Sequence, residues 1–237
     1  EGFNDRPEWT ADGKRILYRR RVETPVFRYE LWWQPWDGSG SAVRLQDPGR
    51  LNGAQEGVVS PDGRTLAYRL QDAGRQELWY RPLVGDTTPR PMPQPRSLLY
   101  GPRFSPDGRW LAYASNRSGV NEVYVRPFPA EGASHVISSG AGDTPVWSRD
   151  GRRLYYVANG RIAVATITTA PEFAVASRAQ FPDGPYDLAV PMHAAFDVAP
   201  DGQHLLMVKR MTTSAQLMVV HDWKYEMRAR VGQAGRK

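Results

Sequence analysis

Few residues of this chain have the types and spacing that catalysis requires. The chain has no cysteine, which excludes thiol nucleophiles and cysteine-ligated metal sites. Its four histidines, His135, His193, His204 and His221, share no metal-ligand spacing. The sequence contains neither a Gly-x-Ser-x-Gly nucleophile elbow nor a phosphate-binding Walker loop. We therefore expect no catalytic residue, no metal and no cofactor within these 237 residues.

Five segments of the sequence share an Asp-Gly pair preceded by a short apolar strand, and their spacing is that of a structural repeat. The segments are Trp9-Thr-Ala-Asp-Gly13, Val59-Ser-Pro-Asp-Gly63, Phe104-Ser-Pro-Asp-Gly108, Trp147-Ser-Arg-Asp-Gly151 and Val198-Ala-Pro-Asp-Gly202. Their glycines are 50, 45, 43 and 51 residues apart, which is typical of four-stranded propeller blades. Ser-Pro-Asp-Gly favours a tight hairpin turn, because proline presets φ and glycine tolerates the left-handed region. The predicted turn residues are Asp12, Gly13, Asp62, Gly63, Asp107, Gly108, Asp150, Gly151, Asp201 and Gly202.

The residues after each turn alternate as in a strand that is buried on both faces. Three residues after the glycines stand Ile16, Leu66, Leu111, Leu154 and Leu205. Five residues after them stand Tyr18, Tyr68, Tyr113, Tyr156 and Met207. The positions between are also apolar, namely Leu17, Ala67, Ala112, Tyr155 and Leu206. A strand that is apolar on both faces needs a neighbouring sheet on each side, which a propeller provides.

Further strands complete each repeat. Third strands are predicted at 30–36, 77–83 and 122–128, with looser copies at 161–167 and 216–221, and weaker fourth strands at segments such as 42–45 and 135–138. We therefore predict an all-β fold, a propeller of five four-stranded antiparallel blades over residues 1–222. The blade boundaries are approximately 1–48, 49–97, 98–139, 140–184 and 185–222. Residues 223–237 are predicted to form a short basic helical tail, capped by Asp222.

These motifs carry a resemblance to a known family. The segment from Phe104 to Gly119, followed by Glu122-Val-Tyr-Val-Arg-Pro-Phe-Pro129, resembles the WD40-like (PD40) repeat of TolB-type β-propellers. Together with the closing Val219-Val-His-Asp-Trp223, it is similar to the C-terminal propeller region of certain bacterial serine/threonine kinases. That resemblance implies a periplasmic or extracytoplasmic location, with the cytoplasm left open. Kinase motifs are absent from the sequence, so any kinase activity would belong to residues outside it.

The number of blades leaves two arrangements open. TolB-type propellers usually have six blades, whereas this sequence contains five turn segments. Either a sixth blade precedes the first residue or five blades close on themselves, and we favour the first. An incomplete ring would expose two blade faces and could dimerise to cover them.

Charge and aromatic residues indicate little about partners. The net charge is +6, but the arginines are spread along the chain rather than gathered as in a nucleic-acid-binding face, so we expect no nucleic-acid partner. Arg19-Arg20-Arg21 is expected to be a solvated strand edge. Trp32, Trp33, Trp36 and Trp79 are expected to pack in the repeat rather than to form a stacking platform. No apolar stretch is long enough to span a membrane.

The expected binding surface is the channel mouth, framed by the loops that enter the innermost strands. Counting back from each turn places nine polar or variable residues there: Asp5, Arg6, Gln55, Glu56, Tyr100, Arg103, Asp143, Thr144 and His193. Variable residues on a constant scaffold can give such a surface its specificity, although they could equally serve only to solvate the loops.

Three functions fit this pattern. The first is a non-catalytic propeller that binds a protein, peptide or envelope ligand, as the sensor or scaffold part of a larger bacterial protein. The second is an accessory propeller that gates a peptidase of the prolyl-oligopeptidase type. The third is a metal-dependent lactonase-like propeller, for which Asp5, Glu56 and Asp143 are the candidate carboxylates. The missing catalytic motifs favour the first.

Overall fold

The structure is a computed structural model of the whole chain. It describes residues 3–23, 27–45, 53–72, 75–93, 97–169, 172–181, 184, 186–188, 193–202, 204–210 and 215–220. The predicted helix after Asp222 and His221 both lie outside these residues. The described part contains no helix of the length and hydrophobicity that crossing a bilayer requires.

The described elements are strands, grouped into five antiparallel sheets. The first sheet has β1 (Asn4–Trp9), β2 (Arg15–Val22), β3 (Arg28–Pro35) and β4 (Val43–Arg44). The second has β5 (Ala54–Val59), β6 (Thr65–Asp72), β7 (Arg75–Pro82) and β8 (Arg90–Pro91). The third has β9 (Leu99–Phe104), β10 (Trp110–Ser115), β11 (Glu122–Pro127) and β12 (His135–Val136). The fourth has β13 (Asp143–Trp147), β14 (Arg153–Ala158), β15 (Arg161–Thr168) and β16 (Ala174–Gln180), and the fifth has β17 (Phe196–Val198), β18 (Leu205–Arg210) and β19 (Ala215–Val220).

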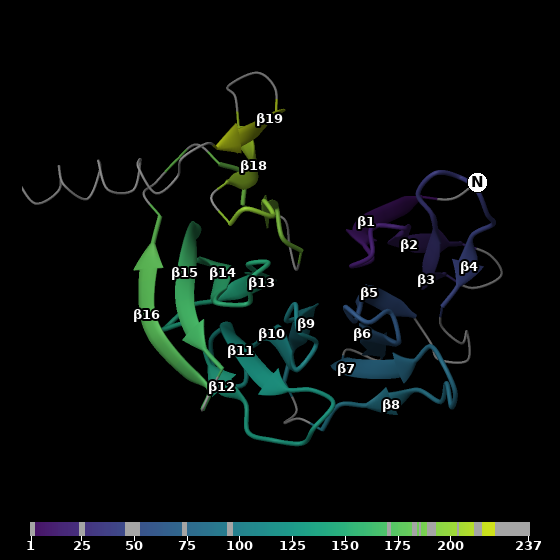
Figure 1. Cartoon of the computed structure of the whole chain (residues 1–237), viewed down its shortest axis with the longest axis horizontal. Coiled ribbons are helices and arrows are strands. Elements are labelled where there is room, and N and C mark those ends of the chain that lie inside the picture. Colours follow the sequence, from purple (N-terminus) through teal and green to yellow (C-terminus); the bar gives the residue numbers. More distant parts are fainter. Residues whose placement is uncertain are drawn as a thin grey trace, which may run out of the picture.

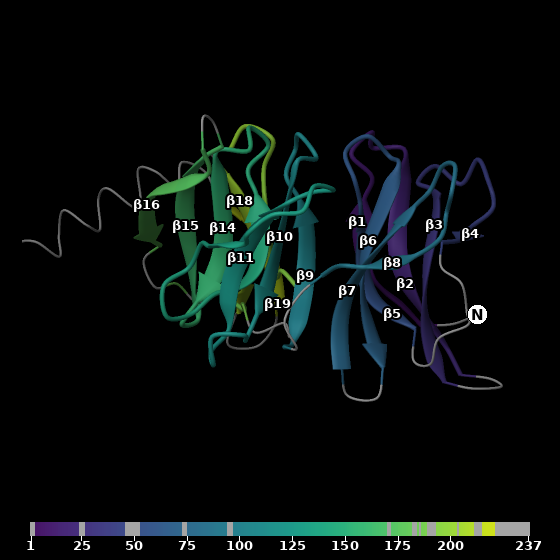
Figure 2. The ribbon, with the colours of Figure 1, turned by 90° about the horizontal axis from the view of Figure 1, so that it is seen from below.

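The five sheets stand side by side along an arc, with their first strands innermost (Figure 1). The view from below shows the sheets packed face to face like the blades of a propeller (Figure 2). An opening separates the fifth sheet from the first, towards the top of Figure 1. The predicted all-β propeller of antiparallel sheets is therefore confirmed, with three strands described in the fifth sheet.

The Asp-Gly segments form the turns between the first and second strands of the sheets. In the second sheet, the Asp62 carboxylate accepts hydrogen bonds from Ser60 Oγ at 2.5 Å and from the Arg64 backbone N–H at 3.0 Å. Gly63 adopts φ = 71°, in the left-handed region that its missing side chain permits. Equivalent side-chain bonds occur at Asp12, Asp107 and Asp150. These carboxylates are engaged in holding the turns.

Neighbouring sheets pack through one interface that repeats four times. Leu17 of the first sheet contacts the core around Leu66 and Tyr68 of the second. Corresponding contacts join each of the next sheets to its follower, through Ala67, Ala112 and Tyr155. In each interface, one sheet contributes the side chain that stands four residues after its turn glycine. The following sheet contributes the side chains that stand three and five residues after its own turn glycine. The apolar columns of the sequence are thus the two halves of the same packing surface.

The two ends of the described arc lack one half of this interface. Trp9 is 60% exposed, whereas its repeat equivalents Val59, Phe104 and Trp147 are 6%, 8% and 9% exposed. At the other end, Leu206 is 38% exposed, although the corresponding residues of the first four sheets are buried. Exposure at the first and fifth sheets agrees with the expectation that an incomplete ring exposes two blade faces, because none of the described sheets fills the opening between them.

Two smaller expectations need correction. Arg19 is 8% exposed and is not part of a solvated edge, since its side chain is held by acidic and amide partners described below. Trp36 is 61% exposed and lies beside the exposed Trp9, with ring centroids 6.5 Å apart. Trp79 is buried, and Trp32 and Trp33 are half-buried, so the packing expectation is correct for these three.

Candidate functional site

The inner strands share an irregularity at one level of the channel. The ladder between first and second strands shifts register within residues 5–8, 54–56, 100–103 and 143–146. In three of these bulges a residue with left-handed φ precedes a proline: Arg6 (54°), Gly101 (63°) and Thr144 (46°). Such conformations are costly for residues with a side chain and are held in place by their surroundings. The bulges therefore set the level at which most of the predicted mouth residues lie.

Glu56 is the centre of a buried polar network at this level. Its side chain is 4% exposed and forms ion pairs with Arg6 at 3.2 Å and with Arg69 at 3.0 Å. It also accepts a hydrogen bond of 2.7 Å from the backbone N–H of Gly101. One carboxylate thereby connects the first, second and third sheets.

Arg19 forms a second part of the network. Its guanidinium binds both carboxylate oxygens of Asp5, at 2.7 and 2.5 Å, and donates to Gln55 Oε1 at 3.0 Å. This bidentate geometry is the strong form of an arginine–carboxylate pair. The ring of Tyr29 lies 4.0 Å from the guanidinium carbon and covers its face.

Tyr100 and Asp143 join the third sheet to the fourth. The Tyr100 hydroxyl donates a hydrogen bond of 3.1 Å to Asp143 Oδ2. Burial, with the Asp143 charge second, raises the pKa of Tyr100. Burial also raises the pKa of Asp143, against the lowering effect of the Tyr100 hydrogen bond. Asp143 Oδ1 and the neighbouring Thr144 Oγ1 are buried and have no hydrogen-bond partner among the described residues.

Arg103 and His193 complete the set of predicted mouth residues. Arg103 of the third sheet pairs with Glu8 of the first, across the channel. Burial raises the pKa of Glu8, while Arg103 acts in the opposite direction. His193 Nδ1 is buried, and no described residue forms a hydrogen bond with it. Burial, followed by the charges of Arg103 and Arg6, lowers the pKa of His193 to about 4, so its imidazole is neutral at pH 7.

The structure thus connects most of the predicted residues and adds three that were not predicted. Contacts link Asp5 with Gln55 through Arg19, Arg6 with Glu56, and Tyr100 with Asp143, whereas Thr144 Oγ1 and His193 Nδ1 meet no partner in the described part of the chain. The additions are Arg19, Arg69 and Glu8. Arg19 and Arg69 each stand six residues after a turn glycine, in a column otherwise occupied by Ala114, Val157 and Val208. An arginine at a repeat position that is apolar in the other copies was the signal in the sequence that could have identified Arg19 and Arg69.

The network leaves little scope for the chemistry of a metal-dependent lactonase. Asp5 and Glu56, two of the three carboxylates considered for that chemistry, are each held by arginine. Within the described residues, no three His, Asp or Glu side chains are grouped closely enough to hold a metal ion. The arrangement is instead one of paired charges on the inner strands, with a few polar atoms at Asp143, Thr144 and His193 that no described residue satisfies.

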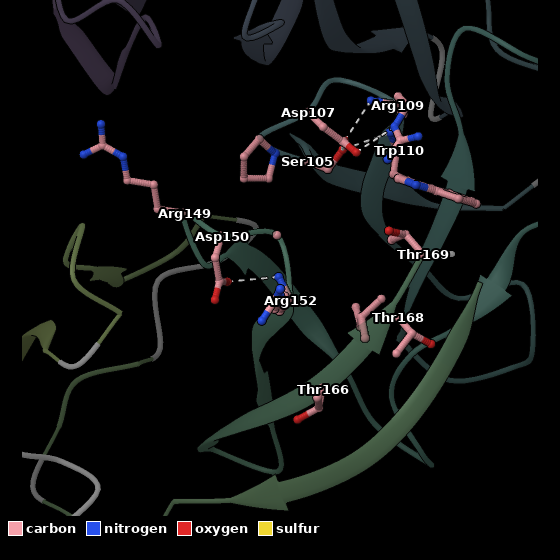
Figure 3. Close-up of a pocket in the computed structure, with 13 residues that line it drawn as sticks. Ser105, Asp107, Arg109, Trp110, Arg149, Asp150, Arg152, Thr166, Thr168 and Thr169 are labelled. Carbon is pink, nitrogen blue, oxygen red and sulfur yellow. Dashed lines mark hydrogen bonds and ion pairs between the residues drawn. The ribbon is translucent and has the colours of Figure 1, made fainter. Parts of the chain in front are cut away.

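A groove of about 760 Å³ lies at a different place, between the turns of the third and fourth sheets and the end of β15 (Figure 3). Asp107 and Asp150 line it but are engaged in their own turns. Arg149 extends away from the other lining side chains. The remaining lining includes Arg109, Trp110 and the Thr168 hydroxyl. These side chains do not converge on one point, so the groove is a weaker candidate than the mouth.

Comparison by sequence finds no relative: no protein-family model and no curated protein matches the chain. Comparison by structure finds many β-propellers. The TolB of Acinetobacter baumannii superposes with a TM-score of 0.74 over 93% of this chain, at 21% identity. A puromycin-hydrolysing peptidase of Mycobacterium tuberculosis matches with a TM-score of 0.60 over 92% of this chain, at 16% identity. The β-propeller domain of the Trilobed protease from Pyrococcus furiosus matches with a TM-score of 0.55 over 93%, at 12% identity.

The match covers a different fraction of the length of each of these proteins. This chain spans about half (52%) of the Acinetobacter TolB, 36% of the peptidase and 69% of the Pyrococcus domain. Identities at this level carry information on the fold rather than on activity. The chain has the fold of TolB and of other WD40-like β-propellers.

Proposed function

We propose that this chain is a non-catalytic binding module that holds a protein or peptide partner at the channel mouth. The observation that supports it most directly is the network of Asp5, Arg6, Glu56 and their partners, which fixes four inner strands relative to one another at one end of the channel. A rigid rim with a few unsatisfied polar atoms suits recognition, because little side-chain entropy remains to be lost on binding.

The wider context is proposed from the resemblance to TolB-type propellers. In that proposal the chain lies in the periplasm or another extracytoplasmic compartment, as the sensor or scaffold part of a larger bacterial protein. The blade boundaries given above, and a sixth blade in the opening of the arc, belong to the same proposal. A gating propeller of a peptidase is the second candidate, and the fold similarity to the Mycobacterium peptidase is the observation that favours it.

A peptide selection tests the binding function and does not require that the natural partner be identified first. The chain is immobilised, peptides are selected from a random library displayed on phage, and their affinities are measured by calorimetry. We expect His193→Ala and Arg6→Gln, both half-buried mouth positions, to weaken the selected peptides at least about tenfold. Arg149→Ala, an exposed position of the groove, is the matched control and should leave affinity unchanged. Peptides that respond to Arg149 and not to the mouth variants would contradict the proposal.

A further inference from the structure

One carboxylate of the mouth differs from the others in its lack of a cationic partner among the described residues. Asp5 is paired with Arg19, Glu8 with Arg103, and Glu56 with both Arg6 and Arg69. Asp143 belongs to the same end of the channel and is half-buried, but no arginine or lysine of the described ranges pairs with it. A partly desolvated carboxylate without a counter-charge is costly, so its retention calls for an explanation.

The atoms around Asp143 indicate what is missing. Tyr100 occupies Asp143 Oδ2, which leaves Oδ1 without a partner in the described structure. The adjacent Thr144 is 5% exposed and its Oγ1 is unsatisfied in the same way, although its backbone is held in the left-handed region at φ = 46°. The Tyr100 hydroxyl, which donates to Asp143, retains lone pairs that can accept. Asp143, the adjacent Thr144 and the hydrogen-bonded Tyr100 thus contribute oxygen acceptors beside a negative charge that no described cation pairs with.

We propose that Asp143, Thr144 and Tyr100 form a subsite for a primary ammonium group of the bound partner, either a lysine side chain or a free amino terminus. The inference rests on the proposed binding function and names the chemistry that the mouth recognises. An ammonium group has three N–H donors and a compact charge, which suits a carboxylate with hydroxyl acceptors on neighbouring side chains.

Other cations fit this subsite less well. A guanidinium binds carboxylates best through two parallel bonds to both oxygens, but Tyr100 already holds one oxygen of Asp143. Calcium takes six to eight oxygen ligands at short distance, roughly twice the number available here. The ammonium is the cation whose requirement the subsite meets.

The test uses small probes and the chain itself, observed by amide NMR. The probes are N-acetyl-lysine N-methylamide and its uncharged isostere N-acetyl-norleucine N-methylamide. A second pair distinguishes the source of the ammonium: alanine amide with a free amino terminus, and N-acetyl-alanine amide without one. We expect a saturable shift of the Thr144 amide with at least one ammonium probe, and binding at least about tenfold weaker for the matched neutral compound.

Variants assign the effect to the subsite. Asp143→Asn keeps the size of the side chain and an oxygen for the Tyr100 hydroxyl, so the fold should persist while ammonium binding falls at least about tenfold. Asp197→Asn is the matched control, because this exposed carboxylate also lies on an inner strand and should not affect the probes. Thr144→Val removes the unsatisfied hydroxyl at similar volume and should weaken the ammonium probe while leaving the melting temperature unchanged or higher.

Three results would overturn the inference: equal binding of lysine and norleucine probes, ammonium binding that survives Asp143→Asn, or saturable calcium binding that the same substitution removes. These outcomes remain distinct from failure of the proposed function. Selected peptides that bind at the mouth with no dependence on an ammonium group would retain the binding function and reject this subsite.

Discussion

Glu56→Gln is the substitution that most directly tests whether the mouth is a fixed scaffold. The substitution keeps the volume of the side chain and one oxygen for the Gly101 N–H, but it removes the negative charge. Arg69, with a side chain 2% exposed, and the largely buried Arg6 would then lose their counter-charge. Breaking a buried ion pair by removing one partner typically costs about 3–5 kcal/mol.

The assay is equilibrium unfolding in urea, followed by tryptophan fluorescence and circular dichroism. We expect the free energy of unfolding to fall by about 3–5 kcal/mol with an unchanged dependence on urea. For a chain of this size, each kcal/mol corresponds to about 2–4 °C, so the melting temperature should fall by roughly 6–20 °C. Adding Arg69→Met to Glu56→Gln removes one of the stranded charges and should restore part of the loss.

Glu23→Gln is the matched control, because Glu23 also pairs with an arginine, Arg21, at 2.9 Å, but on the exposed surface. Exposed pairs contribute little, so the control should cost less than about 1 kcal/mol. Equal and small effects of the two substitutions would refute the reasoning that the buried network holds the inner strands together. If the double variant Glu56→Gln, Arg69→Met is no more stable than Glu56→Gln alone, the loss of stability does not come from the unpaired charge of Arg69.

The remaining predictions concern the histidine of the mouth and the ends of the arc. Since the pKa of His193 is lowered to about 4, the unfolded chain binds its proton more readily, and stability should fall as the pH drops from 6.5 towards 4. Between pH 7 and pH 5 this loss should be up to about 2 kcal/mol, and His193→Gln should reduce it in urea titrations at the two pH values; an identical loss in the variant would argue against the assignment. Trp147→Ala should lower the free energy of unfolding by about 3–5 kcal/mol, whereas Trp9→Ala, at the same repeat position but 60% exposed, should cost less than about 1 kcal/mol. Comparable losses at Trp9 and Trp147 would show that the opening is filled in solution.

Much of the fold could be predicted because its determinants are local. The Asp-Gly turns use bonds between residues two to five apart, such as Ser60 with Asp62 and Thr65. The alternation at Leu66, Ala67 and Tyr68 reports two buried faces within one strand. Repetition of these signals five times then indicates the architecture, since each sheet needs neighbours on both faces.

The site could be located only in part, because its contacts are not local. Arg19 and Gln55 are 36 residues apart in sequence, and Arg103 and Glu8 are 95 apart. Whether such side chains meet depends on the curvature of the arc and on the bulges, which a pattern of alternation does not specify. Counting back from the turns therefore selected inner-strand residues that contact one another but did not identify their ion pairs, and their role as a binding mouth stays a prediction. Pro7, Pro102 and Pro145 were an unused signal for the bulges.

The open arc also determines how the molecule is expected to come apart. In a linear array of similar units, each internal unit is stabilised by two neighbours and each terminal unit by one. The sheets that begin with β1 and β17 should therefore fray first, and their backbone amides should exchange with deuterium fastest. The third sheet has a neighbour on either side and lies farthest from both ends, so the amides of β10 should persist longest. With the opening unfilled, stability should therefore be graded along the described arc, highest at the third sheet and lowest at the first and fifth.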